Sequence, residues 1–531
     1  MRPASPARLL LATGAATALA ACGTTVSGTG IASQQTTGDL GVPGTGTGST
    51  GIPGVGSSTT TGSGTTTSGG LTRSLGGTTT GTSTGTVQPT PVTHPVPPPT
   101  PQHLPGVTAK TIQIGYLNAV NAAAANAAAG APGITTGDAK GEAQTLINDI
   151  NAHGGILGRK IVPVWHAYDP LSTQTLDEQF AAACSDFEQD HHVFAIFGGA
   201  LPGIENCAQK AGAVEIYENL SIDSSQTFRK FTAYVELSML DLDRIIINES
   251  LALSAQGYFA PWDTVNGKPA NVGKAKVGVI GYDTPDYHYA IDHVLRPEFA
   301  NLHQDAPTQD TVYVPIPQTQ SDLGALSAAM ANAVVRFRQD GVDHVMLLDD
   351  SGTLTLEFLN QAESQHYHPR YGWSSQNGPE ALASGGDVQT DQLVGSMGIG
   401  YFPMLDLTAQ QNPDNGPYSN PARRSCLKLL SAHGFSFSDQ NAKGVGLIIC
   451  NQFRFLKTAI EAGGPTIKQA SFIAGVNSLG SKFQSAQTFS TYFSPAQHDG
   501  GGSYRYYAWQ TGCGCMQYTS GLKPAIGEGL R

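Results

Sequence analysis

The sequence holds few charged residues and little positive charge. Only 13% of its 531 residues are Asp, Glu, Lys or Arg, and the formal net charge is −12. From residue 107 onward, 26 basic residues stand against 40 acidic ones. A protein that binds nucleic acid uses basic patches to neutralise phosphate groups. We therefore expect no nucleic-acid partner.

The segment from Gly23 to Gly106 has no aromatic residue and only two charged ones, Asp39 and Arg73. Gly, Thr and Ser dominate it at first, and Pro toward its end. Such a segment cannot bury enough apolar surface to offset its conformational entropy. We expect residues 22–106 to form a disordered tether that is flexible at first and stiffer where proline is frequent.

The apolar run near the N-terminus is too short to span a bilayer, which takes about 20 residues. Arg2 and Arg8 precede apolar and small residues over Leu9–Ala21, which is the pattern of a signal peptide. The run ends in Leu19-Ala20-Ala21-Cys22, which resembles the lipobox of bacterial lipoproteins. We expect residues 1–21 to be removed and Cys22 to carry acyl chains such as palmitate, which anchor the protein outside the cell membrane. An ordinary signal peptide with a chance cysteine is the alternative.

Motifs for catalysis are missing as well. The sequence has neither the phosphate-binding G-x-x-x-x-G-K-[ST] pattern nor the zinc-binding H-E-x-x-H pattern. His191-His192 and the pair His366 and His368 could suggest metal binding. The adjacent His191 and His192 would point to opposite faces of a strand, and two histidines alone make a poor metal site. Asp349-Asp350 could form a general acid–base pair, but no motif supplies its nucleophile. We predict no cofactor, no metal and no enzymatic activity, with a hydrolase as the least favoured alternative.

The rest of the chain alternates strands with helices. Apolar and β-branched runs predict strands over residues 111–117, 161–165, 193–197, 275–281, 311–314, 344–348 and 394–400. Helical spacing of apolar residues predicts helices over residues 139–150, 173–189, 322–338 and 353–363. This alternation is typical of parallel sheets covered by helices on both faces. The 425 residues from 107 to 531 are too many for one such sheet, so we expect two.

Two segments near the start of this part resemble a known family. Ile112–Leu117 forms the first predicted strand, and Ile147–Ile161 reads INDINAHGGILGRKI. The second segment is similar to the I-N-x-x-G-G-I-x-G-x-K pattern of type I periplasmic binding proteins, in particular the branched-chain amino acid (Leu/Ile/Val) binding family. In this pattern the paired glycines end a helix, and the third glycine turns the chain into the next strand. Weaker matches follow at Tyr282-Asp283, Tyr287 and Gly378-Pro379-Glu380, with His288 where the family has glycine.

The resemblance implies an α/β fold of two lobes. Each lobe would be built on a parallel, doubly wound sheet, and a hinge of three crossovers would join them. Lobe 1 would take residues 107–239 and 395–502, and lobe 2 would take residues 240–394 and 503–520. A ligand would bind between the lobes.

The carboxyl ends of the strands are where ligands bind in open α/β sheets. The candidate ligand-binding residues at these ends are Asn118, Ala119, Gly199, Ala200, Asp283, Tyr287, Asp349, Asp350 and Glu380. The resemblance implies that Tyr287 contacts the ligand and that Glu380 pairs with a ligand ammonium group.

Two features argue against an α-amino acid as the ligand. Leu201-Pro202-Gly203 stands where the family has serines that hold an α-carboxylate, which leaves Ser221, Ser224 and Ser225 as candidates for that role. Several carboxylates also follow predicted strands, namely Asp283, Asp286, Asp349, Asp350 and Glu380. In a water-poor cleft they would favour a ligand with an amine or many hydroxyl groups. Alternatively, some of them cap a helix that begins near Thr353.

Apart from Cys22, the sequence has six cysteines: Cys184, Cys207, Cys426, Cys450, Cys513 and Cys515. An exported protein can hold disulfides, and six cysteines allow fifteen pairings. The first two flank one predicted strand, the next two lie on predicted helices, and only Gly514 separates the last two. We predict the pairs Cys184–Cys207, Cys426–Cys450 and Cys513–Cys515, with a redox-active C-x-C as the alternative for the last.

Together these features predict a lipid-anchored solute-binding protein outside the bacterial cell membrane. The resemblance implies that it captures a small polar ligand, amino-acid-like or other, for an ABC importer whose permease would be its partner. A ligand-binding sensory or receptor lipoprotein without a transporter is the alternative.

Overall fold

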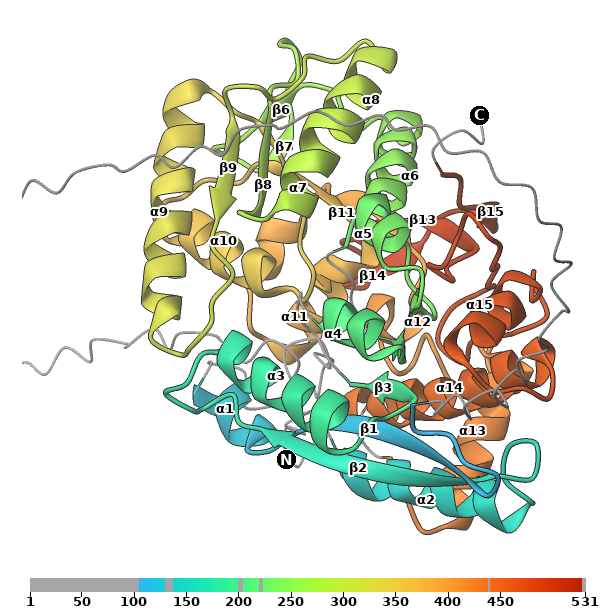
Figure 1. Ribbon diagram of the computed structural model, residues 1–531. Helices are drawn as coiled ribbons and strands as arrows, with labels where there is room; N and C mark the ends of the chain where they lie inside the picture. The colour runs from blue at the N-terminus through green and yellow to red at the C-terminus, as the bar shows by residue number, and fades with distance from the viewer. Residues whose placement is uncertain (1–104, 129–136, 199–203, 219–222, 438–439, 528–531) are drawn as a thin grey trace, which may run out of the picture. The chain divides into compact units, whose positions relative to one another are not determined.

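The computed structural model describes residues 105–128, 137–198, 204–218, 223–437 and 440–527 (Figure 1). The predicted signal peptide, Cys22 and nearly all of the predicted tether lie outside these residues. So do the candidate residues Gly199, Ala200 and Ser221. Within the ranges that the structure describes, no helix is both long and apolar enough to cross a membrane.

The first sheet is five-stranded and parallel. It consists of β1 (Thr111–Ala119), β2 (Lys160–Tyr168), β3 (Ala195–Phe197), β4 (Val214–Tyr217) and β5 (Tyr234–Glu236), in the order β2-β1-β3-β4-β5. Short runs of β-branched and aromatic residues form these strands, as suits a sheet that is covered on both faces.

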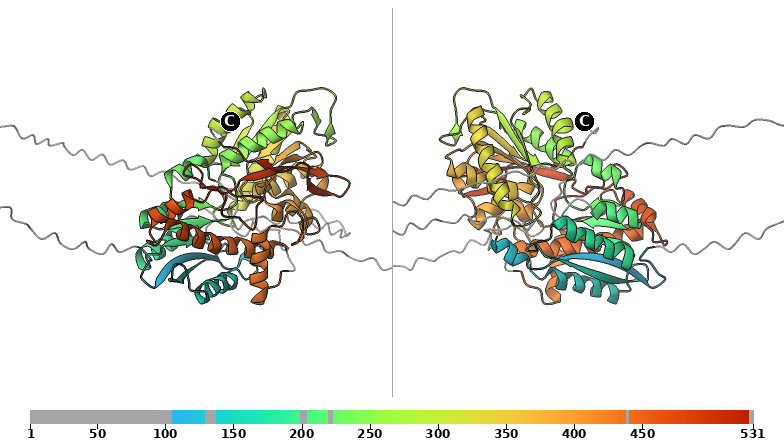
Figure 2. Two further views of the ribbon diagram at one scale, coloured as in Figure 1. Left: turned by 90° about the vertical axis from the view of Figure 1, so that its right-hand side faces the viewer. Right: turned by 60° about the vertical axis from the view of Figure 1, so that its left-hand side comes forward.

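Helices cover the two faces of this sheet and enclose a separate hydrophobic cluster on each. They are α1 (Ala122–Ala128), α2 (Ala139–Ala152), α3 (Leu176–Ser185) with the π-helical turn η1 (Asp186–Asp190), α4 (Ile204–Ala211), α5 (Ser225–Lys230), α13 (Pro421–Ala432), α14 (Gln440–Gly463) and α15 (Gln469–Asn477). Although α13–α15 come from a distant part of the chain, α14 packs against α2. Figure 2 shows these orange helices beside the blue and teal strands. We call this sheet and its helices lobe 1.

The second sheet has eight strands. They are β8 (Val277–Tyr282), β9 (Thr311–Val314), β10 (His344–Leu347), β11 (Arg370–Trp373), β12 (Met397–Gly400), β13 (Ser503–Gln510), β14 (Cys515–Tyr518) and β15 (Lys523–Pro524). The order is β14-β13-β12-β11-β10-β8-β9, and β15 pairs with β13. The strands from β8 to β12 are parallel, whereas β13, β14 and β15 pair antiparallel.

Helices and a small hairpin complete this second part, which we call lobe 2. The helices are α6 (Leu242–Ala255), α7 (Pro285–Ala290), η2 (Ile291–Leu295), α8 (Arg296–Asn301), α9 (Asp322–Asp340), α10 (Thr353–Ser364), η3 (Ser375–Asn377), α11 (Pro379–Gly385), η4 (Thr390–Leu393) and α12 (Pro403–Asp406). The hairpin pairs β6 (Trp262–Asp263) with β7 (Lys268–Pro269).

The predicted α/β class with two sheets is confirmed. All seven predicted strands and all four predicted helices are present, with ends shifted by a few residues. The short strands β4, β5 and β11 and the antiparallel strands at the edge of the second sheet were not predicted from the sequence. The strand predicted over 394–400 is β12, which pairs with β11 and β13 of lobe 2, whereas the sequence analysis counted it with lobe 1.

The chain crosses between the sheets three times, after β5, after β12 and before β13. Arg244, near the start of α6, is buried at these crossings and forms an ion pair with Asp499. Its Nη2 also donates to the carbonyl oxygens of Gly501 (2.7 Å) and Ala525 (3.2 Å). One guanidinium group therefore joins three segments of the chain at the crossings.

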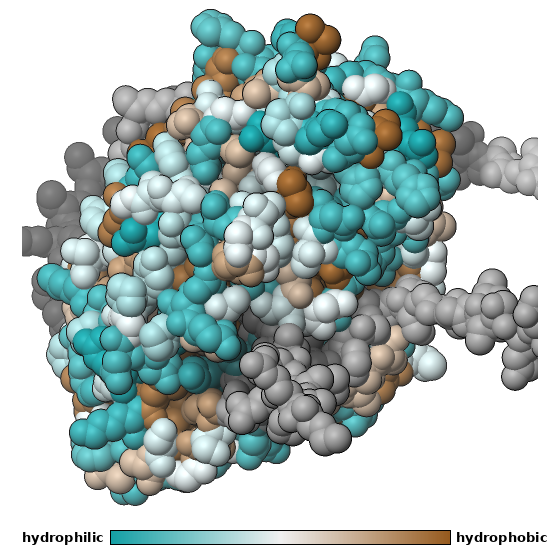
Figure 3. All heavy atoms as spheres, turned by 180° about the vertical axis from the view of Figure 1, so that it is seen from behind, coloured by the Kyte–Doolittle hydropathy of each residue, from teal (hydrophilic) through white to brown (hydrophobic). Residues whose placement is uncertain are grey.

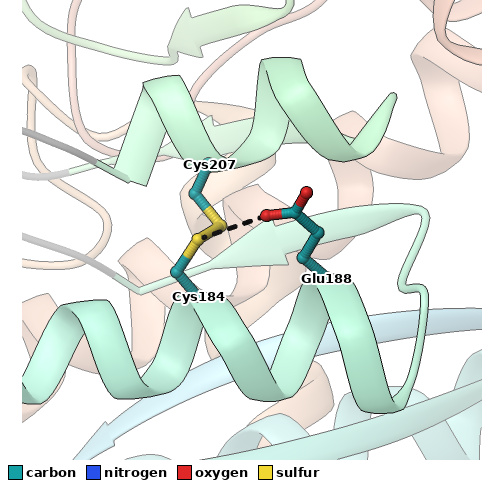
Figure 4. A group of neighbouring side chains, drawn as sticks. All are labelled: Cys184, Glu188 and Cys207. Carbon is teal, nitrogen blue, oxygen red and sulfur yellow. Dashed lines mark hydrogen bonds between the residues drawn. A yellow bond between two sulfur atoms is a disulfide. The ribbon is translucent and has the colours of Figure 1, made fainter.

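The three disulfides join the predicted pairs, Cys184–Cys207, Cys426–Cys450 and Cys513–Cys515. The first links the end of α3 to α4, and the carboxylate of Glu188 lies 3.8 Å from Cys184 Sγ (Figure 4). Gly514, inside the shortest ring, has φ of +61°, a left-handed conformation that favours glycine. This glycine gives the bend that two cysteines so close in sequence need.

Candidate functional site

Asp349 follows β10 at the carboxyl edge of the second sheet, and its carboxylate is fully engaged. Oδ1 accepts hydrogen bonds from the backbone N–H groups of Asp350 (2.8 Å) and Ser351 (3.2 Å). Oδ2 accepts from the backbone N–H (2.8 Å) and the hydroxyl (2.7 Å) of Thr355. Burial raises the pKa of Asp349, and these donors oppose the rise. Asp349 thus caps the first turn of α10, which was the alternative interpretation of this carboxylate.

Asp350 lies beside two tyrosines. The hydroxyl of Tyr282 donates to Asp350 Oδ1 at 3.1 Å. The rings of Tyr282 and Tyr287 meet edge to face, with centroids 5.4 Å apart. Burial, and then the charge of Asp349, raise the pKa of Asp350 to about 7. Burial thus favours the protonated form of Asp350, in which its carboxyl group can also donate a hydrogen bond.

Glu380 lies in the first turn of α11, and its carboxylate bonds within lobe 2. Oε1 accepts from the hydroxyl of Ser384 and Oε2 from the backbone N–H of Met516, each at 2.6 Å. Because Met516 belongs to β14, Glu380 ties α11 to the antiparallel edge of the sheet. Burial raises the pKa of Glu380 to about 7. Both of its oxygens thus have protein donors.

Asp283 differs from these carboxylates because its side chain is 61% exposed. It lies 2.8 Å from Nε2 of His288, whose ring stacks on Tyr313 with centroids 3.9 Å apart. In lobe 1, the candidates Asn118 and Ala119 are half-buried at the end of β1. Asp283 therefore faces solvent rather than the group formed by Asp349, Asp350 and the two tyrosines.

Another carboxylate of lobe 2 bonds directly to lobe 1. Asp286, in the first turn of α7, accepts hydrogen bonds at Oδ1 from the backbone N–H (2.8 Å) and hydroxyl of Ser224 and from the hydroxyl of Thr227 (2.9 Å). The backbone N–H groups of the first two residues of α3 donate to the carbonyl and side-chain oxygens of Gln318, each at 3.1 Å. Ser225, another hydroxyl candidate, donates to Asp243 in α6. The carboxyl edges of the two sheets are joined by these contacts.

A polar run, Ser374–Asn377, directly follows β11 and is not among the residues that the sequence predicted for the site. Asn377 Nδ2 donates to the carbonyl of Leu347 (2.8 Å) and to the hydroxyl of Thr355 (3.0 Å), and so links the ends of β10 and β11. The hydroxyl of Ser375 accepts from the backbone N–H groups of the two residues after β12. Four consecutive polar residues were the available signal, but the short strand before them was not predicted.

A second missed network lies in lobe 1. Glu218, directly after β4, accepts hydrogen bonds at Oε1 from the hydroxyl of Ser238 (2.6 Å) and from Nδ2 of Asn451 (2.7 Å). Ser485 bonds to both Ser238 (2.7 Å) and Asn451 (2.8 Å). Burial raises the pKa of Glu218 to about 8, although these donors and Arg454 lower it. Segments far apart in sequence build this network, so no local pattern in the sequence could predict it.

Two groups of side chains in the described ranges have the spacing of metal ligands. In the first, Cys184, Glu188 and Cys207, both sulfur atoms belong to a disulfide, so neither is a thiolate ligand. In the second, Glu363, His368 and Asp391 each place one ligand atom within 4.8 Å of the others. Asp391 is exposed, and Glu363 already accepts a hydrogen bond from Gln392 at 2.9 Å.

The structure is similar to solved structures of solute-binding proteins of ABC transporters. One from R. palustris, in complex with 4-hydroxybenzoate, is 14% identical over 79% of this chain and 99% of that chain, with a TM-score of 0.55. Another, from Rhodopseudomonas palustris HaA2 in complex with p-hydroxybenzoic acid, is 12% identical over 78% of this chain and 98% of that chain, with a TM-score of 0.54. A fatty acid ABC transporter substrate-binding protein from Thermomonospora curvata is 16% identical over 79% of this chain and 94% of that chain, with a TM-score of 0.51. No protein-family model matches the sequence, and no curated protein is similar to it in sequence.

At these identities the similarity establishes the fold. The chain has the two-lobed fold of type I periplasmic binding proteins, as the segment Ile147–Ile161 implied.

Proposed function

We propose that this protein is a solute-binding protein, anchored outside the bacterial cell membrane, that captures a small polar ligand between its lobes for an ABC importer. The observation that carries the proposal is the position of Asp286. A single carboxylate oxygen of lobe 2 accepts three hydrogen bonds from lobe 1, where the carboxyl edges of the sheets are joined. Three chain crossings near Arg244 supply a hinge about which such a contact could form and break.

The ligand would bind at these carboxyl edges, where the sequence placed its candidates. These remain Asn118, Ala119, Gly199, Ala200, Asp283, Tyr287, Asp349, Asp350 and Glu380. The carboxylate oxygens of Asp349 and Glu380 already accept hydrogen bonds from protein donors. Their negative charge therefore does not require a cationic ligand. Asp350, with a pKa of about 7, suits a hydroxyl group as well as an amine. We therefore rank polyhydroxylated solutes above cationic ones, and both above leucine.

A metabolite screen tests capture by closure. The full chain, purified in mild detergent, is incubated with a cell extract, and retained compounds are identified by mass spectrometry. We expect a small polar compound that also raises the melting temperature. Asp286→Ala should weaken its retention about tenfold, because hydrogen bonds to a charged acceptor are lost.

Asp292→Ala is the matched control, since Asp292 is exposed and pairs with Arg296 inside lobe 2. Equal retention by both variants would contradict closure through Asp286. If no extract yields a retained compound, the solute-binding function itself is wrong.

Anchoring and the transport partner need separate tests. Cys22→Ser should move the protein from the membrane fraction to the soluble fraction or leave it as a precursor, because the acyl chains that hold it are absent. Cross-linking in cells should then capture a permease with the unaltered protein. Ligand binding without any captured permease would favour the receptor alternative.

A further inference from the structure

Lobe 1 contains a cavity of about 250 Å³ between α2, α13 and α14. The α2 residues that line it, from Leu146 to Ile150, belong to the C-terminal half of that helix. Its floor is apolar and consists of Leu146, Phe453 and the disulfide Cys426–Cys450, all exposed by 3% or less. In Figure 3 hydrophobic side chains gather in the lower part of the molecule, where α2 and α13 lie in Figure 1.

One side of the cavity carries two cationic side chains from α14, Arg454 and Lys457. Arg454 donates through Nη1 to Asn451 Oδ1 (3.2 Å) and to the carbonyl of Gln484 (3.1 Å). Among the residues that the structure describes, its Nε and Nη2 have no acceptor. These two N–H groups form one edge of the guanidinium fork, which matches the two oxygens of a carboxylate. Lys457 is paired with the exposed Glu461, so Arg454 is the stronger anion site.

Inside lobe 1, the charge of Glu218 acts on Arg454, but Oε1 of Glu218 already accepts hydrogen bonds from two side chains and burial raises its pKa to about 8. A second acid lies on the opposite side of the cavity. Asp149 lies there, and its Oδ1 is 3.4 Å from Nδ1 of His153. His153 is 77% exposed, whereas Asp149 is only 25% exposed. The cavity therefore combines an apolar floor, one cationic end and an acidic residue with its own local partner.

We infer that this cavity binds a small organic anion with an apolar body. The carboxylate would pair with Nε and Nη2 of Arg454, and the apolar body would cover Phe453 and the disulfide, whose sulfur atoms make favourable contacts with aromatic rings. The cavity is smaller than the roughly 300–1,000 Å³ that drug-sized ligands occupy, which limits the ligand to a compact acid. None of the residues that line this cavity is among the candidates for the proposed site between the lobes.

Calorimetry with 3-phenylpropionate tests this inference on the full chain held in lipid nanodiscs. The acid should bind at least about tenfold more tightly than its uncharged amide, because only the acid forms charge-assisted hydrogen bonds with Arg454. Arg454→Gln should reduce the affinity for the acid to that for the amide, and Arg454→Lys should restore part of the difference. Equal binding of acid and amide, or no binding of the acid, would overturn the inference.

A second variant does not depend on the contacts of Arg454. Ser425 is exposed at the mouth of the cavity, so Ser425→Trp should abolish binding without disturbing the core. Ser431→Trp is the matched control, because Ser431 is also exposed on α13 but lines a separate hollow beside Phe435. Unchanged binding by Ser425→Trp would overturn the inference.

Asp286→Ala distinguishes the two sites. If it leaves the binding of 3-phenylpropionate unchanged, the acid does not need the contact between the lobes, as we expect. If it abolishes that binding, the acid occupies the site between the lobes, which contradicts this inference and leaves the proposed function standing.

Discussion

Asp349 and Glu380 of lobe 2 accept hydrogen bonds at both carboxylate oxygens. In lobe 1, by contrast, Glu142, Glu215 and Glu218 each have one buried oxygen without a partner in the described chain. Burial raises the pKa of Glu142 and Glu218 to about 8 each. Such acids keep a proton at neutral pH, so lobe 1 loses stability when they ionise.

The disulfides also differ between the two lobes. The two that close long loops, with sequence separations of 23 and 24 residues, both lie in lobe 1. The disulfide of lobe 2 has a separation of only 2 residues. Lobe 1 thus holds both long cross-links together with these acids, whereas Asp349 and Glu380 of lobe 2 are fully hydrogen-bonded. Other acids of lobe 2, such as Asp406, also have one buried oxygen without a partner in the described chain.

The largest expected effect comes from removing a long cross-link of lobe 1. Cys426→Ala with Cys450→Ala should lower the free energy of unfolding by about 3 kcal/mol, because the unfolded chain gains the freedom of an open loop. Denaturant unfolding measures the loss, and hydrogen exchange should place it in α13 and α14. A loss that appears mainly in lobe 2 would break the comparison.

The next effect concerns the complete hydrogen bonding of Asp349 in lobe 2. Asp349→Asn keeps the shape of the side chain but replaces one acceptor oxygen with an amide group, which cannot accept from Thr355. We expect a loss of about 2 kcal/mol in the free energy of unfolding. Asp283→Asn, at an exposed carboxylate, should change it by less than about 0.5 kcal/mol. If both variants lowered the free energy of unfolding equally, the four hydrogen bonds to Asp349 would not contribute to stability.

A third prediction tests the protonated acids of lobe 1. Glu142 has a pKa of about 8 in the folded protein because of burial and of Asp138 nearby, whereas a glutamate in the unfolded chain titrates near its ordinary value of 4.5. Between these values the folded state holds a proton that the unfolded state has released, so stability falls as the pH rises from about 4.5 to about 8.

Glu142→Gln removes this titration. It should raise the free energy of unfolding by about 1–2 kcal/mol at pH 8 and change it little at pH 4. Chemical denaturation across this pH range measures the effect. Glu461→Gln is the control, because Glu461 is exposed and pairs with Lys457, and it should leave the pH dependence of stability unchanged. If Glu142→Gln did not reduce the fall in the free energy of unfolding between pH 4 and pH 8, the raised pKa of Glu142 would not be its cause.

The smallest effect is expected from the disulfide of lobe 2. Cys513→Ala with Cys515→Ala should cost about 1 kcal/mol or less, because the closed loop is very short and restrains few conformations of the unfolded chain. Thermal unfolding measures it beside the Cys426–Cys450 variant. A loss as large as that of the long loop would remove the contrast between the lobes.

Local patterns in the sequence determined seven of the strands, four of the helices and the turn after α2. In that turn, Asn151 bonds through its side chain to the backbone N–H (2.7 Å) and carbonyl (2.8 Å) of Ile161. Gly155 and Gly158 have φ of +71° and +77°, a region that glycine enters at little cost. A Cβ at Gly155 would also lie 2.0 Å from the carbonyl oxygen of Arg159. These requirements lie within a few residues of one another, so the motif could be recognised from the sequence alone.

Strands without a strong local pattern escaped sequence analysis. β4 and β11 have only four residues each, and β13 pairs with β12, which lies about a hundred residues earlier in the chain. The polar run Ser374–Asn377 was missed for this reason, since its position after a strand became visible only when β11 was placed in the sheet.

Only the tertiary structure decided what the carboxylates do. The sequence placed Asp286, Asp350 and Glu380 after strands, but each accepts a hydrogen bond from a donor 62, 68 or 136 residues away, respectively. Whether a buried acid stays charged depends on such donors and on burial, and packing sets both. The sequence could therefore name the acids at the edge of the sheet, whereas the fold determined that Glu380 ties α11 to β14, that Asp350 lies beside two tyrosines and that Asp286 joins the lobes.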